Sequence, residues 1–186
     1  MMNENSSKTW ILNVFNRAAP CYGEKGCQFF DVFGRELVTL AQVNPGEEIL
    51  DVATGKGAIL FPASQAIGKT GTAIGIDLSL AMITEAQKRN ALSSVQLLVM
   101  DAEKLVFPSH SFDVIFCGFA LFFFPNLSAV LDEFKRVLKP NGKVAVSVWG
   151  RPSSLTHWVL NGFFEKALYP SDHRPVISLS NLISKQ

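Results

Sequence analysis

Short apolar segments alternate with amphipathic segments between residues 48 and 149 of this chain. The apolar segments are 48–53, 72–76, 95–99, 112–117 and 143–149. They are hydrophobic along their whole length, as strands covered on both faces are, instead of at every second position. The segments between them include 58–67, 80–89 and 127–138, where apolar residues recur at helical spacing. This order predicts an α/β fold: a doubly wound, mostly parallel sheet with helices on both faces.

Two helices are expected before the first strand. Apolar positions recur at helical spacing in 11–18 and again in 30–41, and the segment Pro20–Gly23 separates them. Near the other end, Pro140–Gly142 is a turn signal that is expected to end the helix beginning at Leu127. A length of 186 residues is typical of a single domain.

Charge and composition limit the partners of the chain. Seventeen basic and sixteen acidic residues leave a net charge of +1, which does not supply the basic field of a nucleic acid-binding protein. The longest apolar stretch, 114–124, is shorter than the roughly 18 residues of a membrane span, and the N-terminus lacks the order of a secretory signal. Cys21, Cys27 and Cys117 have no C-x-x-C spacing. We therefore expect a cytoplasmic protein with no nucleic acid partner, no membrane span, no disulfide framework and no metal site.

The first three predicted strands each lead to polar or glycine residues at the carboxyl end. Asp51–Gly57 follows the first strand, and its glycines allow a ligand to come close to the backbone. Asp77 ends the second strand and is placed to accept hydrogen bonds from both hydroxyls of a ribose, while Asp101 follows the third and can accept from the amine of adenine. Since ligands bind at the carboxyl ends of parallel strands, these positions predict a nucleoside site.

These residues also admit other interpretations. A glycine loop also closes many turns that bind nothing, and Asp77 could be a helix N-cap. The residues from Gly55 to Leu60 lack the third glycine of a dinucleotide-binding loop, and no Walker sequence follows the glycines. A nucleotide-dependent oxidoreductase is therefore the weaker alternative.

The segment Ile49–Gly57 resembles motif I of class I, Rossmann-like S-adenosylmethionine-dependent methyltransferases. It is most similar to the ubiquinone/menaquinone C-methyltransferase-like group, in which alanine is common at the position of Ala53. Further segments resemble family motifs in the same order, over about residues 14–149. They are Val14–Tyr22, Gly75–Ser79 with Met82, Met100–Glu103 with Leu105, Phe112–Ile115 and Leu138–Gly142.

The resemblance implies S-adenosylmethionine as the cofactor. Gly55 and Gly57 would lie against its methionine part with Asp51 nearby, and Asp77 would hold the ribose. Leu78 and Met82 would line the adenine, Asp101 and Ala102 would meet its amine edge, and Tyr22 would close over the sulfonium. The full set of expected cofactor-binding residues is Tyr22, Asp51, Ala53, Thr54, Gly55, Gly57, Asp77, Leu78, Met82, Asp101, Ala102, Cys117, Gly118 and Phe119.

Methyl transfer from a sulfonium depends chiefly on in-line alignment, so no catalytic residue is required. His157 is the one candidate for a general base, and it could equally be a helix surface residue. Phe119 and Phe122–Phe124 could line an acceptor pocket or belong to the core. The expected reaction is methylation of a small, lipophilic or aromatic acceptor. The alternative within the same fold is a module that binds S-adenosylmethionine without catalysis.

The C-terminal segment departs from the family pattern. The family closes its sheet with two further strands, whereas only a helix at 153–168 and a short stretch at 176–179 are expected after Trp149. Three outcomes are open for the last strand: the tail covers it, another copy covers it in a homodimer, or the closing strands are missing, which we favour. The expected parts are an N-terminal helical lead-in and cofactor lid (1–44), a cofactor-binding core (45–150) and a partial substrate-side segment (151–186).

Overall fold

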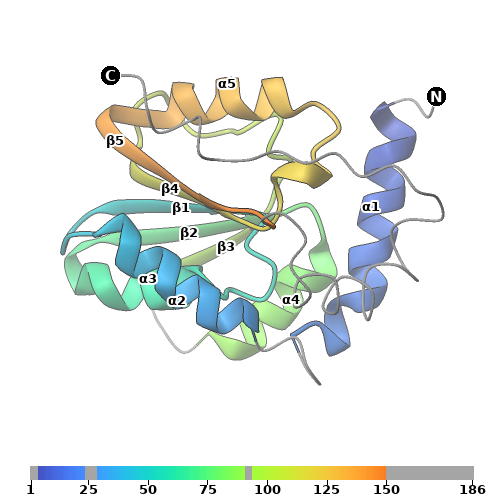
Figure 1. The fold of residues 1–186 in the computed structure, drawn as a ribbon, viewed down its shortest axis with the longest axis horizontal. Coiled ribbons are helices and arrows are strands. Elements are labelled where there is room, and N and C mark those ends of the chain that lie inside the picture. Colours follow the sequence, from blue (N-terminus) through green and yellow to red (C-terminus); the bar gives the residue numbers. More distant parts are fainter. Residues whose placement is uncertain (1–3, 24–28, 91–93, 150–186) are drawn as a thin grey trace. The chain divides into compact units, whose positions relative to one another are not determined.

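The computed structural model describes residues 4–23, 29–90 and 94–149 (Figure 1). Nearly all of them belong to one compact unit, Met1–Ser147. The predicted helix at 153–168, the stretch at 176–179 and His157 lie outside the described residues.

A sheet of five parallel strands forms the centre of this unit, in the order β3-β2-β1-β4-β5. The strands are β1 Glu48–Val52, β2 Thr72–Asp77, β3 Val95–Val99, β4 Phe112–Gly118 and β5 Leu138–Ser147. Strand order reverses between β1 and β4, and such switch points are where open α/β sheets bind ligands. The predicted doubly wound parallel sheet is confirmed.

Helices cover both faces of the sheet. They are α1 Glu4–Ala18, α2 Phe29–Ala41, α3 Leu60–Ile67, α4 Leu80–Arg89 and α5 Leu127–Val137, with 3-10 turns at Ala19–Cys21, Gly68–Thr70 and Leu121–Phe123. Figure 1 shows α5 on one face of the sheet and α2 and α3 on the other, while α1 stands beside α4. The helix α1 begins two turns earlier than its apolar residues predicted, which brings Lys8 into the helix.

The central strands are buried because their side chains are apolar on both faces. Ile49 and Leu50 of β1 and Val114 and Ile115 of β4 have no exposed surface. Among the described strands β3 and β5 are the edges, and Val99 and Val144 there are about half exposed. The hydrophobic pattern thus predicted the centre of the sheet well.

The last strand differs from the prediction. β5 begins at Leu138, directly after α5, and it ends at Ser147, before Trp149. Leu138 pairs with Phe112, and the pairing resumes only at Lys143 opposite Val114, so the segment between is an irregularity in the strand. Asn141 lies within it with a φ of 64°. The predicted turn residues at 140–142 do interrupt the pairing, but the chain pairs with β4 both before and after them.

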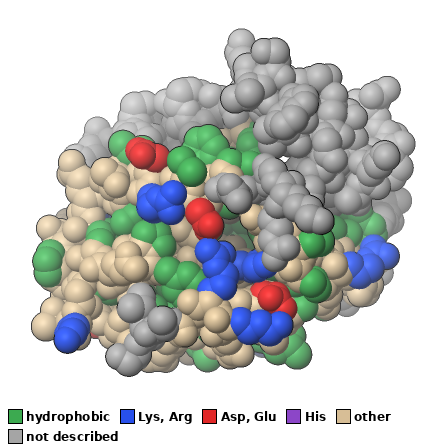
Figure 2. Space-filling model, turned by 90° about the horizontal axis from the view of Figure 1, so that it is seen from below, with side chains coloured by type: hydrophobic (Ala, Val, Ile, Leu, Met, Phe, Trp, Pro, Cys, Tyr) green, Lys and Arg blue, Asp and Glu red, His purple; other side chains and the backbone are tan. Residues whose placement is uncertain are grey.

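Basic and acidic side chains are intermixed on the face shown in Figure 2. None of the helices in the described ranges is long and apolar enough to cross a membrane. No cluster of three metal-ligating side chains occurs among those residues.

Candidate functional site

Asp77 joins the ends of two strands. Its Oδ2 accepts a hydrogen bond from the Gly55 N–H at 2.9 Å, and its Oδ1 accepts from the Ser79 N–H at 2.8 Å. The N-cap of α4 is Ser79, whose Oγ accepts from the Met82 N–H, so Asp77 is not the capping residue. Burial raises the pKa of Asp77 to about 6, against the opposing effect of the backbone N–H groups of Ser79 and Gly55. The Leu78 N–H also favours the charged form, and the carboxylate keeps capacity to accept a further hydrogen bond.

Asp51 is buried at the end of β1. Its side chain is 1% exposed, and Oδ2 accepts a hydrogen bond from the Thr54 hydroxyl at 2.6 Å. Its Oδ1 has no hydrogen-bond partner among the described residues. Burial raises the pKa of Asp51 to about 7, the Thr54 hydroxyl opposes this shift, and the charge of Asp77 adds to it. A buried acceptor without a partner fits a ligand that brings a donor or a cation.

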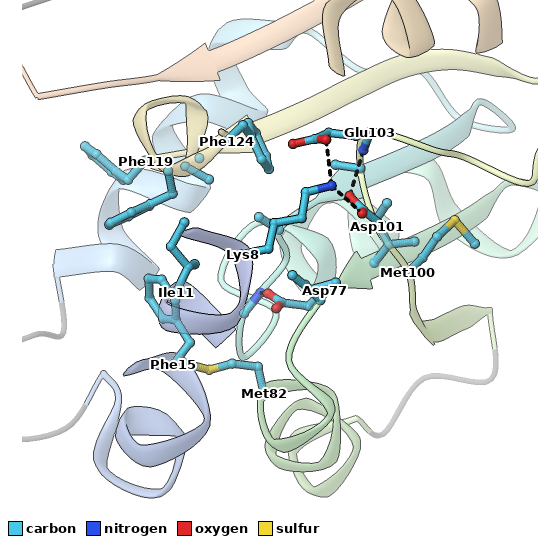
Figure 3. A pocket seen from close by; sticks show the side chains of 18 of the residues that line it. Lys8, Ile11, Phe15, Asp77, Met82, Met100, Asp101, Glu103, Phe119 and Phe124 are labelled. Atoms are coloured by element: carbon cyan, nitrogen blue, oxygen red, sulfur yellow. Dashed lines mark hydrogen bonds and ion pairs between the residues drawn. The ribbon is translucent and has the colours of Figure 1, made fainter. Parts of the chain in front are cut away.

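A pocket opens at the carboxyl ends of the strands and contains about 790 Å³, the space at its mouth included. Ten of the predicted cofactor-binding residues line it: Tyr22, Ala53, Gly55, Asp77, Leu78, Met82, Asp101, Ala102, Gly118 and Phe119. Asp77 and Asp101 supply acceptors on a wall that is otherwise largely apolar, as a nucleoside requires (Figure 3).

A second pocket adjoins the first and shares Tyr22, Ala53, Gly55, Gly118 and Phe119 with it. Asp51 and Thr54 line this second pocket. Its wall also includes Phe30, which stacks on Tyr22 with ring centroids 5.1 Å apart and meets Phe119 edge-on at 5.8 Å. The residues shared by the two pockets mark where a ligand in one could react with a ligand in the other.

Two of these shared residues have left-handed backbones. Ala53 has a φ of 56° and Phe119 a φ of 54°, which costs about 1–2 kcal/mol for a residue with a Cβ. The surrounding sheet holds both of them, since the Thr54 N–H donates to the Ile76 carbonyl and the Phe119 N–H donates to the Ser147 carbonyl. Strain of this kind concentrates at functional sites.

Not every predicted residue reaches these pockets. Gly57 lies in the turn before α3, and Cys117 is fully buried in β4, where burial raises its thiol pKa well above the usual range. Neither residue lines either pocket. Of the phenylalanines after β4, Phe119, Phe123 and Phe124 line the first pocket, whereas Phe122 packs against Phe123.

The sequence interpretation missed the contribution of α1. Lys8, Ile11 and Phe15 line the first pocket, and all three lie on one face of α1. A signal was available, since Lys8 precedes Ile11 by three positions and Phe15 follows by four. The Ser79 hydroxyl also donates to Asn16 Oδ1 at 2.6 Å, which attaches α1 to the start of α4.

Comparison with known proteins agrees with this geometry. The family model described as "Methyltransferase domain" matches residues 50–146, more than half of the chain. The chain belongs to this methyltransferase family. The prediction of a class I S-adenosylmethionine-dependent methyltransferase is thereby confirmed.

Individual relatives support the same assignment. The methyltransferase is 35% identical over 147 residues to aklanonic acid methyltransferase of Streptomyces sp. (strain C5), covering 77% of this chain and 67% of that protein. It is 34% identical over 139 residues to demethylmenaquinone methyltransferase of Oceanobacillus iheyensis, covering 73% and 58%. The chain thus spans about three fifths to two thirds of these relatives' length.

A solved structure shows the same fold. The crystal structure of a SAM-dependent methyltransferase from Aquifex aeolicus aligns with a TM-score of 0.59 at 25% identity. The alignment covers 72% of this chain and 78% of that one. The cofactor expected for the methyltransferase is accordingly S-adenosylmethionine.

Proposed function

We propose that this methyltransferase transfers the methyl group of S-adenosylmethionine to a small, lipophilic or aromatic acceptor. The observation that carries the proposal is the pair of adjoining pockets at the switch point of the sheet. One has Asp77 and Asp101 on an apolar wall, and the other is lined by aromatic rings and by Asp51, whose buried Oδ1 has no hydrogen-bond partner among the described residues.

The residues present fit the cofactor. Asp77 would accept from the ribose hydroxyls with the capacity that its backbone partners leave free. Leu78, Met82 and Ala102 would hold the adenine, with Asp101 at its amine edge. Asp51 Oδ1 would accept a hydrogen bond from the ammonium of the methionine part, and this oxygen would then have a partner.

The bound cofactor supplies an electrophilic methyl group on a sulfonium. The contribution of the chain is alignment and exclusion of water, which together account for much of the acceleration of a displacement. Tyr22, Phe30 and Phe119 wall the second pocket with stacked and edge-on rings.

The aromatic wall favours a flat acceptor, because planar ligands gain from offset stacking and edge contacts. The two relatives are named for aklanonic acid and for demethylmenaquinone, the second of which is a quinone. Both names are consistent with a flat acceptor that packs against this aromatic wall.

Three further features belong to this proposal. Residues 1–44 act as a cofactor lid, supported by the three α1 side chains that line the first pocket. The exposed edge of β5, where Val144 is about half exposed, is covered by another strand, in a homodimer if a second copy supplies it. The enzyme works in the cytoplasm, where its cofactor is available.

Calorimetric titration with S-adenosylhomocysteine tests the cofactor assignment, with NADH as the competing ligand class. We expect S-adenosylhomocysteine to bind the wild type and NADH not to bind. Asp77→Ala should abolish binding, whereas Asp132→Ala on the exposed side of α5 should bind normally. Undiminished binding by Asp77→Ala would refute the site. In a separate experiment, a screen of flat phenols and hydroxyquinones with the wild type would identify the acceptor class.

A further inference from the structure

Lys8 reaches from α1 across the first pocket to its far wall (Figure 3). Its Nζ lies 2.7 Å from Asp101 Oδ2 and 2.6 Å from Glu103 Oε2. Met82 and Ala102, which are expected to hold the adenine, line the same pocket. A cation of the chain itself therefore occupies the amine edge of the adenosine site.

The Lys8 ammonium is more sheltered than that of an ordinary surface pair. The Lys8 side chain is 24% exposed, and its partners Asp101 and Glu103 are 36% and 11% exposed, whereas Lys88, in the pair with Glu85 on α4, is 64% exposed. Burial alone would lower the pKa of Lys8, but hydrogen bonds and charges from Asp101 and Glu103 outweigh it and raise the pKa above its usual value. Lys8 is thus a charged ammonium within the pocket.

Both oxygens of Asp101 are already engaged. Oδ1 accepts from the Glu103 N–H at 3.0 Å, and Oδ2 accepts from Lys8. A carboxylate oxygen can accept a second hydrogen bond, but the Lys8 ammonium lies against Oδ2 inside the pocket, so an adenine amine that approaches this oxygen from the pocket meets Lys8. Glu103 offers Lys8 an alternative, because its Oε1 accepts from the Asn126 N–H at 3.1 Å while Oε2 faces Lys8. Lys8 can therefore leave Asp101 without losing its other carboxylate.

We propose that Lys8 competes with the adenine amine for Asp101, so that this internal ion pair sets both the cofactor affinity and the selectivity for a 6-amino purine. The proposal rests on the proposed function, since it takes the first pocket as the adenosine site. Cofactor binding then exchanges one donor on Asp101 for another, while Lys8 remains on Glu103.

Two ligands that differ only at position 6 of the purine test the competition. S-adenosylhomocysteine carries an amine donor there, and S-inosylhomocysteine carries a carbonyl acceptor. Lys8→Met keeps the length of the side chain and removes its charge. It should tighten S-adenosylhomocysteine binding about two- to fivefold, the range for loss of a partly exposed ion pair. It should weaken S-inosylhomocysteine binding, because the carbonyl loses Lys8 as a donor.

Lys104→Met is the matched control, since Lys104 lies in the same loop as Asp101 but is exposed and does not line the pocket. Lys8→Gln provides a second variant that retains a neutral donor, and its S-adenosylhomocysteine affinity should fall between those of wild type and Lys8→Met. Thermal unfolding of each variant checks that it is folded.

Three outcomes would overturn the proposal. In the first, Lys8→Met binds both ligands more tightly by the same factor, which would indicate simple removal of bulk. In the second, Lys8→Met binds S-adenosylhomocysteine more weakly than the wild type does. In the third, Lys8→Met and the Lys104→Met control bind S-adenosylhomocysteine with the same affinity. Wild type that binds neither ligand would refute the proposed function itself. Binding lost in Asp77→Ala but unchanged in Lys8→Met would refute the competition alone.

Discussion

The Asp77 carboxylate accepts a hydrogen bond from the Gly55 N–H at 2.9 Å, which joins the end of β2 to the loop after β1. Gly55 has a φ of 55°, and a Cβ there would come no nearer than 3.9 Å to the Tyr22 ring. Glycine is therefore favoured at position 55 by the left-handed backbone conformation and not by a lack of space for a side chain. The same carboxylate thus shapes the loop and faces the pocket.

Asp77→Asn should lower the affinity for S-adenosylhomocysteine about ten- to a hundredfold. The amide keeps the size of the side chain, but its NH2 group would face a backbone N–H donor, and the charge that strengthens hydrogen bonds to ribose is lost. Calorimetric titration beside Asp132→Asn measures the effect. Equal affinities in the two variants would mean that Asp77 serves only the loop.

The free energy of unfolding of the ligand-free protein should fall as pH rises from 5 to 8. Burial raises the pKa of Asp51 to about 7 from 3.8, so the folded state retains a proton that the unfolded state releases. A raised acid pKa stabilises the fold at low pH, and this stability is lost as pH rises through the folded-state pKa. The loss from Asp51 over this interval is about 2–3 kcal/mol.

Urea unfolding of wild type and Asp51→Asn at several pH values in this interval measures that loss. Asp77, whose pKa burial raises to about 6, contributes with the same sign, so the variant should keep a shallower slope. The lowered pKa values of Asp113 and Glu133 act below pH 5 and do not interfere. Parallel profiles for the two proteins would contradict the role assigned to Asp51.

Gly34→Ala should destabilise the protein by about 1–3 kcal/mol. A Cβ on Gly34 would lie 2.2 Å from the carbonyl oxygen of Ala58, a backbone atom that cannot move aside easily. Within a helix the same substitution ordinarily stabilises by roughly 0.5–1 kcal/mol, so the sign of the change is diagnostic. Urea unfolding checks it, with Thr39→Ala on the exposed side of α2 as the control. A stabilised Gly34→Ala variant would show that α2 is not held against Ala58.

Phe30→Leu should raise the KM for an aromatic acceptor about three- to tenfold, because aromatic pairs contribute about 0.5–1.5 kcal/mol beyond burial. Phe30 does not line the first pocket, where Asp77 and Asp101 would hold the adenosine, so S-adenosylhomocysteine affinity should change less than the KM. Steady-state kinetics and calorimetry separate the two effects. Phe107→Leu, in a pair with Phe112 and lining neither pocket, controls for general loss of aromatic packing. A change confined to cofactor affinity would mean that Phe30 contacts the cofactor and not the acceptor.

The sequence indicated β1 and β4 clearly because both are apolar along their whole length. Asp77 and Asp101 could be placed at one edge of the sheet because parallel strands end together. The start of β5 could not be predicted, since Leu138 is in a strand only through its pairing with Phe112. Lys8 and Phe30 lie in helices that are distant in sequence from most of the residues they join in the pockets. Their positions there could not be predicted, because they depend on how α1 and α2 pack against the sheet.

The Ser79 hydroxyl accepts from the Met82 N–H and donates to Asn16, so one side chain both begins α4 and fastens α1. The two bonds are independent, because one uses an oxygen lone pair and the other the hydroxyl proton. Detachment of α1 would expose that proton to water while the first turn of α4 and the Asp77 carboxylate stay in place. Movement of the N-terminal helix would therefore break the bond to Asn16 and leave intact the bond that begins α4.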